Sequence, residues 1–264
     1  MELSSEFQSM LLDAKQLAAY PHIESLVSMV NEGFHSRHHE IFATHEQRRF
    51  ENVEELIESM DAVGRFCIIT QSLENQAPRI VACSMLKEYH ERDPVSRPPL
   101  NKGDGKDIST PNRVNETSKL PESSASEPNL TLATLHAKSE DPDIDVRSVS
   151  NWELGIVVVR QDPQLSKRGL AVRCASLLEK DLLERLERAE KEDGNGAITP
   201  VGKQQPLTFW VMTTEATNGS YWQRRGFETV HTKTLPKGFW GAYKDFELAW
   251  MKKCIPRRAV SSFS

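Results

Sequence analysis

Apolar side chains recur every three or four residues in two stretches near the N-terminus. Residues 52–60 carry this spacing, and residues 21–34 carry it at Ile23, Leu26, Val27, Val30 and Phe34. Both stretches predict amphipathic helices. The period then changes to that of strands. Residues 65–70 (RFCIIT) and 79–89 (RIVACSMLKEY) predict two strands joined by a turn.

The second half of the chain alternates strand and helix patterns. Residues 149–159 (VSNWELGIVVV) predict a strand buried on both faces towards its end. A long helix follows with apolar residues every fourth position, at Leu170, Cys174, Leu178, Leu182 and Leu186. Further strands are predicted at 207–213, from Phe227, and at 245–251, with a short helix near 219–225. The order predicts an α/β or α+β fold, a mixed sheet with helices packed on it.

Residues 91–147 differ in character from the sequence on either side. They are rich in Pro, Ser, Asn and charge, and they hold half of the chain's 14 prolines. Such a stretch buries too little apolar area to offset the entropy cost of ordering. We therefore expect one domain over 1–264, interrupted by a disordered insertion at 91–147, with its core at 149–251.

Composition narrows the class of protein further. The 264 residues are 38% hydrophobic and 27% charged, and the net charge of −5 gives no global reason to bind nucleic acid. No apolar stretch reaches the roughly 20 residues that span a membrane, and the N-terminus lacks signal-peptide features. The four cysteines are far apart, without metal-ligand spacing, so we expect no metal site and reduced thiols in the cytoplasm.

The turn between the 149–159 strand and the long helix predicts an anion site. A helix N-terminus has free N–H groups and a partial positive charge. Gly169 allows unusual backbone dihedrals and a close approach of the anion, and Ala171 is small and favours the helix. Lys167 and Arg168 add positive charge, and the Ser166 hydroxyl can bond an anion or cap the helix.

The same segment resembles motif A of the GNAT superfamily, the acetyl-CoA-dependent N-acetyltransferases. Pro163, Gly169, Ala171 and the pair Leu177–Leu178 match the motif, and residues 208–230, ending in Gly226–Phe227–Glu228–Thr229–Val230, resemble motif B. The resemblance implies a mostly antiparallel twisted sheet flanked by helices, with acetyl-CoA as cosubstrate and no metal. The chain departs from the pattern at Ser166, where Gln or Arg is usual, and at Gln161, where Val is common.

The resemblance also implies roles for particular residues. Glu153, on the motif A strand, is the candidate general base, and alternation along a strand would place it on one face with Val157, Val159 and Gln161. Trp222 occupies the position of the usual proton-donating tyrosine, so Tyr221 is the candidate acid. The residues expected to contact the cofactor are Val157, Val159, Gln161, Ser166, Lys167, Arg168, Gly169, Leu170, Ala171, Asn218 and Trp222.

The acceptor is expected to be a small-molecule amine, because no basic tail or chromatin-reading module accompanies the domain. His35, His38 and His39 either shape its pocket or are solvated, and Phe239, Trp240 and Tyr243 suit an apolar acceptor or pack within a hairpin. Two alternatives stay open. The chain could be a catalytically silent CoA-binding module, or an enzyme that transfers an acyl group to oxygen or transfers a longer acyl chain. The oligomeric state is not indicated.

Overall fold

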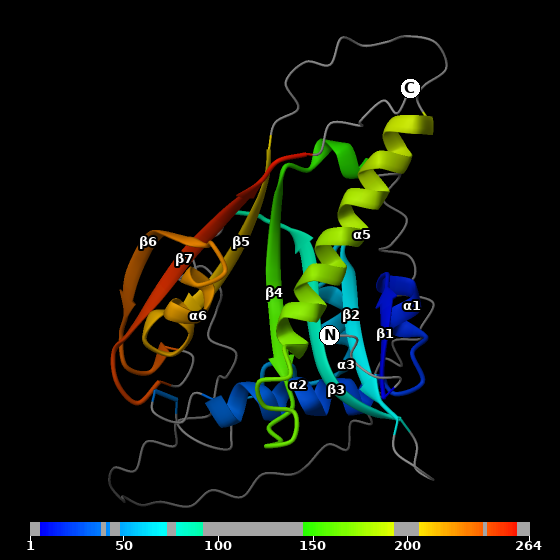
Figure 1. Ribbon diagram of the computed structural model, residues 1–264. Helices are drawn as coiled ribbons and strands as arrows, with labels where there is room; N and C mark the ends of the chain where they lie inside the picture. The colour runs from blue at the N-terminus through cyan, green and yellow to red at the C-terminus, as the bar shows by residue number, and fades with distance from the viewer. Residues whose placement is uncertain are drawn as a thin grey trace, which may run out of the picture. The chain divides into compact units, whose positions relative to one another are not determined.

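Seven strands pair into one sheet within the residues that the structure, a computed structural model, describes: 6–37, 41–42, 48–72, 78–91, 145–192, 206–239 and 242–257 (Figure 1). Their order is β1-β2-β3-β4-β5-β7-β6. Neighbours are antiparallel except β4 and β5, which run parallel, so the predicted mixed and mostly antiparallel sheet is confirmed. The strands are β1 (Phe7–Leu12), β2 (Arg65–Gln71), β3 (Arg79–Glu88), β4 (Asn151–Val159), β5 (Leu207–Thr214), β6 (Glu228–Leu235) and β7 (Phe246–Ile255).

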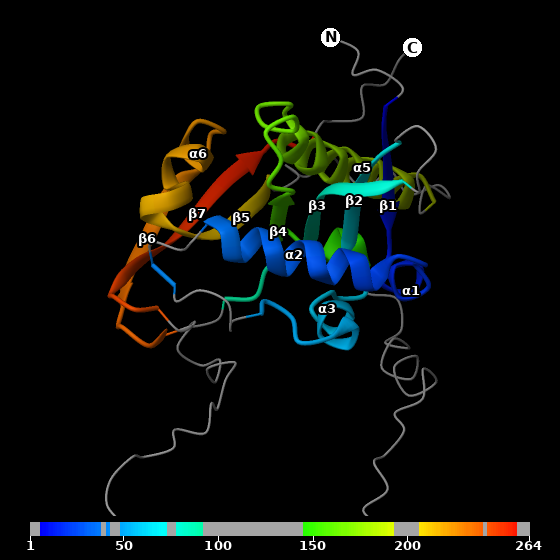
Figure 2. The ribbon, with the colours of Figure 1, turned by 90° about the horizontal axis from the view of Figure 1, so that it is seen from below.

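Helices cover both faces of this sheet, which Figure 2 shows from below. α5 (Leu170–Glu192) packs on one face, and α2 (Ile23–Arg37) packs on the other beside α1 (Ala14–Ala18) and α3 (Val53–Glu58). We name these the α5 face and the α2 face. The Asn52 side chain caps α3 by accepting the Glu55 N–H at 2.9 Å. The helices expected from the apolar spacing are therefore confirmed, with ends shifted by a few residues.

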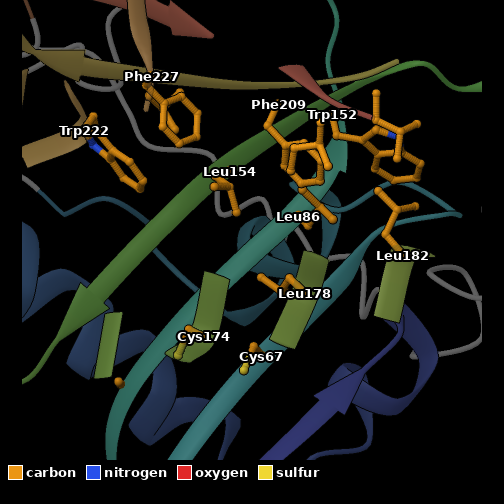
Figure 3. Close-up of a cluster of buried hydrophobic side chains, with 14 of the residues drawn as sticks. Cys67, Leu86, Trp152, Leu154, Cys174, Leu178, Leu182, Phe209, Trp222 and Phe227 are labelled. Carbon is orange, nitrogen blue, oxygen red and sulfur yellow. The ribbon is translucent and has the colours of Figure 1, made fainter. Parts of the chain in front are cut away.

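One hydrophobic cluster fills the α5 face and includes every apolar position predicted for the long helix: Leu170, Cys174, Leu178, Leu182 and Leu186. Figure 3 labels Cys174, Leu178 and Leu182 among them. They pack against β4 and its neighbours, with Trp152 fully buried beneath them. Cys174 forms a hydrogen bond with Cys67. This bond is the largest cause that raises the pKa of the Cys174 thiol, and burial is the next largest. The thiol is therefore neutral and belongs to the core, as the helical spacing predicts.

Two separate clusters cover the α2 face. The α2-face cluster joins α1, α2 and α3 to β2, β3 and the end of β4, and it contains Ile156 and Val158. A hairpin cluster lies over β5, β6 and β7 and is formed by Ile41, Leu235, Ala242, Phe246, Leu248 and Trp250. Between them, the face carries half-buried polar and aromatic residues of β3, β4 and β5, which include Lys87, Glu153 and Trp210.

Two regions differ from the sequence expectation or lie beyond it. No element is predicted before residue 21, yet β1 and α1 form there, because β1 pairs with β2 along its full length. The predicted disordered insertion ends too late, since Val146–Ser148 form a 3₁₀ turn, η2, that packs against α5. Residues 92–144 lie outside the described residues, so disorder there stays a prediction.

Candidate functional site

The two parallel strands β4 and β5 pair over only a short distance. Their register is Asn151 with Thr208, Trp152 with Phe209, and Glu153 with Trp210. Both strands continue, β4 to Val159 and β5 to Thr214, and Figure 1 shows them diverging towards their C-terminal ends. Beyond Glu153, the edge of β4 that faces β5 therefore carries main-chain groups outside the ladder between these strands.

Strand alternation identifies which groups these are. The Arg160 N–H donates to the Val81 carbonyl of β3 at 2.8 Å, so the main chain at Arg160 points towards β3. Along a strand, the main-chain groups of successive residues point to opposite sides. Val157 and Val159 lie an odd number of positions before Arg160, so their amides and carbonyls point away from β3 and towards β5. Their side chains pack against the α5-face cluster. These two predicted cofactor residues thus present main-chain groups where β4 and β5 separate.

A β-bulge at Gly155 decides which face Glu153 occupies. In the pairing of β3 with β4, Leu86 lies opposite Leu154 and Met85 lies opposite Ile156, so Gly155 has no partner in β3. The extra residue reverses the alternation of β4 side chains between the two faces of the sheet. The expectation that Glu153 shares a face with Val157 and Val159 is therefore wrong: Glu153 lies on the α2 face, and the valines lie on the α5 face.

The Glu153 carboxylate forms an ion pair directly over the bulge. Glu153 Oε2 lies 3.7 Å from Lys87 Nζ, and the two side chains are 19% and 14% exposed. A Cβ added at Gly155 would meet Glu153 Oε1 at 3.5 Å and Lys87 Cε at 3.6 Å. The ion pair therefore lies at ordinary contact distance from this position, whereas the Met85 methyl carbon, 2.9 Å from the added Cβ, would have to move.

The turn that follows β4 is organised by Asp162. Its Oδ1 accepts the Gln164 N–H at 2.9 Å, and its Oδ2 accepts Arg79 Nη2 at 2.8 Å. Both bonds lower the pKa of the Asp162 carboxyl, and the bond from the Gln164 N–H has the larger effect. The Leu165 side chain is buried in the α5-face cluster and holds the turn against the hydrophobic core.

The turn ends in a backbone geometry that leaves the first amides of α5 free. Lys167 has φ 60° and Gly169 has φ 73°. The first bond of the helix runs from the Arg173 N–H to the Gly169 carbonyl at 2.9 Å, so the amides of Leu170 and Ala171 precede the intrahelical ladder. A Cβ on Gly169 would meet nothing within 4 Å, so the space beside this glycine is open.

The charged side chains at this turn point in different directions. Ser166 and Lys167 are exposed, as is Gln161. Arg168 turns back towards β1, where its Nη2 lies 3.2 Å from Glu6 Oε2 and its guanidinium lies over the Phe7 ring at 5.1 Å. Leu170 is buried, so only its main chain can face an anion. The positive charge of Arg168 is therefore compensated within the chain.

The other border of the divergence is formed by η3 (Glu215–Gly219), a π-helical turn, and α6 (Ser220–Gln223). Trp222 is buried and packs edge-to-face on Phe227 at 5.1 Å, inside the α5-face cluster (Figure 3). Tyr221 is half-buried at the margin of the same cluster, with the Arg225 guanidinium 4.1 Å from its ring centre, and Asn218 is half-buried in η3. Glu153 and Tyr221 thus belong to opposite faces of the sheet.

Among the other predicted residues, Phe239 packs with the hairpin cluster and Tyr243 is exposed. Trp240 and the side chains of His35, His38 and His39 lie outside the described residues. Lys87, Tyr89 and Trp210 are not among the residues predicted from the sequence, although a lysine and a tyrosine at alternate positions of an otherwise apolar strand are a usable signal.

Two kinds of feature are absent from the described part of the chain. No three His, Cys, Asp or Glu side chains gather there in a way that could hold a metal ion. None of the helices in that part is both long and apolar enough to cross a membrane.

Comparison with known proteins gives structural likenesses only. No family model and no curated protein matches the sequence. A GNAT-family acetyltransferase from Streptococcus pneumoniae aligns over 95% of this chain and 99% of its own, with 10% identity and a TM-score of 0.44. The Salmonella typhimurium protein yncA, solved with its cofactor acetyl-CoA, aligns over 98% and 100% with 9% identity and a TM-score of 0.45.

The spermidine/spermine N-acetyltransferase SpeG from Vibrio cholerae aligns over 95% of both chains, with 10% identity and a TM-score of 0.43. These TM-scores are below 0.5 and the identities are at most 10%.

Proposed function

We propose that this chain transfers an acetyl group from acetyl-CoA to the amine of a small-molecule acceptor by direct attack on the thioester. One observation carries the proposal. The divergence of β4 and β5 begins at Glu153, and β4 then leads into the free amides at the start of α5. An extended amide-containing arm that ends in a diphosphate is complementary to both features.

The donor set of the chain fits that cosubstrate. The main chains of Val157 and Val159 can hydrogen-bond the amides of the pantetheine arm as a neighbouring strand would. The amides of Gly169, Leu170 and Ala171 are suited to the diphosphate, with Ser166 and Lys167 at the rim. Such charge-assisted bonds contribute about 1.5–3 kcal/mol each, more than one exposed side-chain charge. We assign lesser contacts to Gln161, Arg168, Asn218 and Trp222.

The chemistry requires proton transfers at two atoms. The amine nitrogen forms a bond to the thioester carbonyl carbon, and the carbon–sulfur bond breaks. Glu153 accepts the proton that the nitrogen loses, directly or through a water molecule. The thiolate that leaves receives a proton from Tyr221 or from water. The products are the N-acetylated amine and the free thiol of CoA.

The test combines binding with thiol release. Calorimetry should detect acetyl-CoA binding, and a thiol reagent should detect CoA release when a suitable amine is added. Glu153→Gln should keep acetyl-CoA affinity while the rate falls by about 10²- to 10⁴-fold, the usual contribution of a general base. An unchanged rate would remove Glu153 from the mechanism, and absent binding would remove the cosubstrate.

A catalytically silent CoA-binding module is the second candidate, and the burial of Trp222 favours it. The residue that takes the place of the usual acid is packed into the core against Phe227 and has no hydroxyl. This candidate predicts acetyl-CoA binding without thiol release for any acceptor. Transfer to oxygen or of a longer acyl chain would instead show as an ester product, or as a preference for longer acyl-CoA.

A further inference from the structure

In sequence, two arginines flank the free amides at the start of α5, and both side chains contact the N-terminal segment. Arg168 lies just before the helix, and Arg173 lies one turn into it. Arg168 Nη2 lies 3.2 Å from Glu6 Oε2, and its guanidinium lies over the Phe7 ring at 5.1 Å. Arg173 Nη2 makes longer contacts, 3.5 Å to the Phe7 carbonyl oxygen and 3.4 Å to Ser9 Oγ. The cations on either side of the proposed diphosphate site are thus engaged by β1 and the residue before it.

The Glu6 carboxylate is held in place from the side of β2. Its Oε1 accepts a hydrogen bond from Gln71 Nε2, and the Glu6 main-chain carbonyl accepts the Ser72 N–H at 2.9 Å. The ion pair with Arg168 is nevertheless partly exposed, since the side chains of Arg168 and Glu6 are 38% and 36% exposed. An ion pair in contact with water is weak, so a stronger anion can displace Glu6 from Arg168.

The strand that engages the two arginines is itself weakly buried. Phe7 is the one buried side chain among the six residues of β1, and the strand lies at the edge of the sheet, where it pairs with β2. An edge strand that buries so little apolar surface opens locally at a low cost in free energy. Contacts with Arg168 and Arg173 therefore matter both for the attachment of β1 and for the charge at the start of α5.

A diphosphate at the first amides of α5 is an alternative partner for Arg168. Arg168 directly precedes Gly169, so a diphosphate at these amides would lie within reach of its side chain. Glu6 engages Arg168 through one nitrogen, Nη2, whereas a phosphate can take two guanidinium nitrogens in parallel. The Glu6 carboxylate also places a negative charge at this turn, which repels a diphosphate. Both effects have the same sign, because each makes Glu6 oppose the binding of the anion.

On the basis of the proposed function, we propose that the N-terminal strand restrains the binding of acetyl-CoA. In the free chain Glu6 holds Arg168 over Phe7, and the diphosphate takes Arg168 from Glu6 when acetyl-CoA binds. Loss of the Glu6 contact then loosens β1 at the edge of the sheet. Because the coupling between two binding equilibria is reciprocal, a change that releases Arg168 from β1 must also tighten acetyl-CoA binding.

The experiment measures acetyl-CoA binding by calorimetry in the unaltered chain and in Glu6→Gln. Glutamine removes the charge but keeps an oxygen that can accept the bond from Gln71. We expect Glu6→Gln to bind acetyl-CoA about two- to fivefold more tightly, the coupling of a partly exposed ion pair. The control is Glu179→Gln, which removes a carboxylate of similar exposure that lies 4.0 Å from Lys253 and should leave the affinity unchanged. Equal or weaker binding by Glu6→Gln would overturn the inference and leave the proposed function standing.

Further variants locate the effect at Arg168. In an Arg168→Gln background, Glu6→Gln should no longer change the affinity, and a gain that persists there would contradict competition for Arg168. Phe7→Leu removes the ring beneath the guanidinium and should also tighten binding, which covers the case in which Glu6→Gln does not fold.

Hydrogen exchange tests the reciprocal effect on the strand. Residues 7–12 should exchange faster when acetyl-CoA is bound, while residues 169–173 exchange more slowly. Slower exchange in β1 on binding would show that the strand supports the cosubstrate and does not restrain it. If the unaltered chain binds no acetyl-CoA, the proposed function fails together with this inference.

Discussion

Gly169 and Gly226 form a matched pair for testing the anion turn. Both have a positive φ, 73° at Gly169 and 81° at Gly226, and both are exposed. A Cβ added at either position would meet no atom within 4 Å. Gly169 immediately precedes α5, whereas Gly226 follows α6. Alanine therefore creates the same backbone strain at both positions and differs only in what occupies the space beside it.

The magnitudes follow from this comparison. An alanine held at a positive φ costs about 1–2 kcal/mol of unfolding free energy, and no steric clash adds to it at either site. At Gly169 the new methyl group also stands in the open space beside the first amides of α5. Loss of one charge-assisted amide bond, worth about 1.5–3 kcal/mol, weakens acetyl-CoA binding by about 10- to 150-fold.

Urea unfolding and titration calorimetry measure the two effects separately. Gly169→Ala and Gly226→Ala should lose similar unfolding free energy, and only Gly169→Ala should lose acetyl-CoA affinity. If Gly169→Ala binds acetyl-CoA within about twofold of the unaltered chain, the amides of α5 do not hold the diphosphate. Equal weakening by Gly226→Ala would show that the effect arises from general destabilisation.

Two further changes test the supports of the site. In Gly33→Ala, the new Cβ would lie 2.2 Å from Val158 Cγ1, so we expect a loss of about 1–3 kcal/mol in urea unfolding, relieved by adding Val158→Ala; a gain in stability, as helix propensity alone predicts, would contradict this contact. The pKa of Asp162 is lowered from its ordinary value of 3.8. The carboxylate therefore stabilises the folded chain fully at a pH above 3.8, and this stabilisation is lost as the pH falls through the lowered pKa. Asp162→Asn should therefore flatten the acid limb of the stability profile and speed amide exchange in residues 163–168, and identical acid limbs would refute the role of this carboxylate.

Local periodicity was sufficient for most of the fold. The fourfold spacing from Leu170 to Leu186 identified both the long helix and its buried side, because a helix brings such residues onto one stripe. The apolar runs at 65–70 and 79–89 identified β2 and β3 for a similar reason. The sequence pattern did not predict β1, since Phe7 is its single buried side chain and its pairing partner lies some 60 residues away.

The candidate site divides in the same way. The sequence by itself predicted the glycine turn before α5, because glycine has a local conformational freedom that does not depend on the rest of the chain, and Gly169 does have a positive φ; that this turn binds an anion stays a prediction. Only the tertiary structure decided the face on which Glu153 lies, since the bulge at Gly155 exists only in the register between β3 and β4. It also decided where β4 and β5 part, and it brought Lys87, Tyr89 and Trp210 beside Glu153. Pairing between distant strands sets these positions, and no pattern within one strand encodes it.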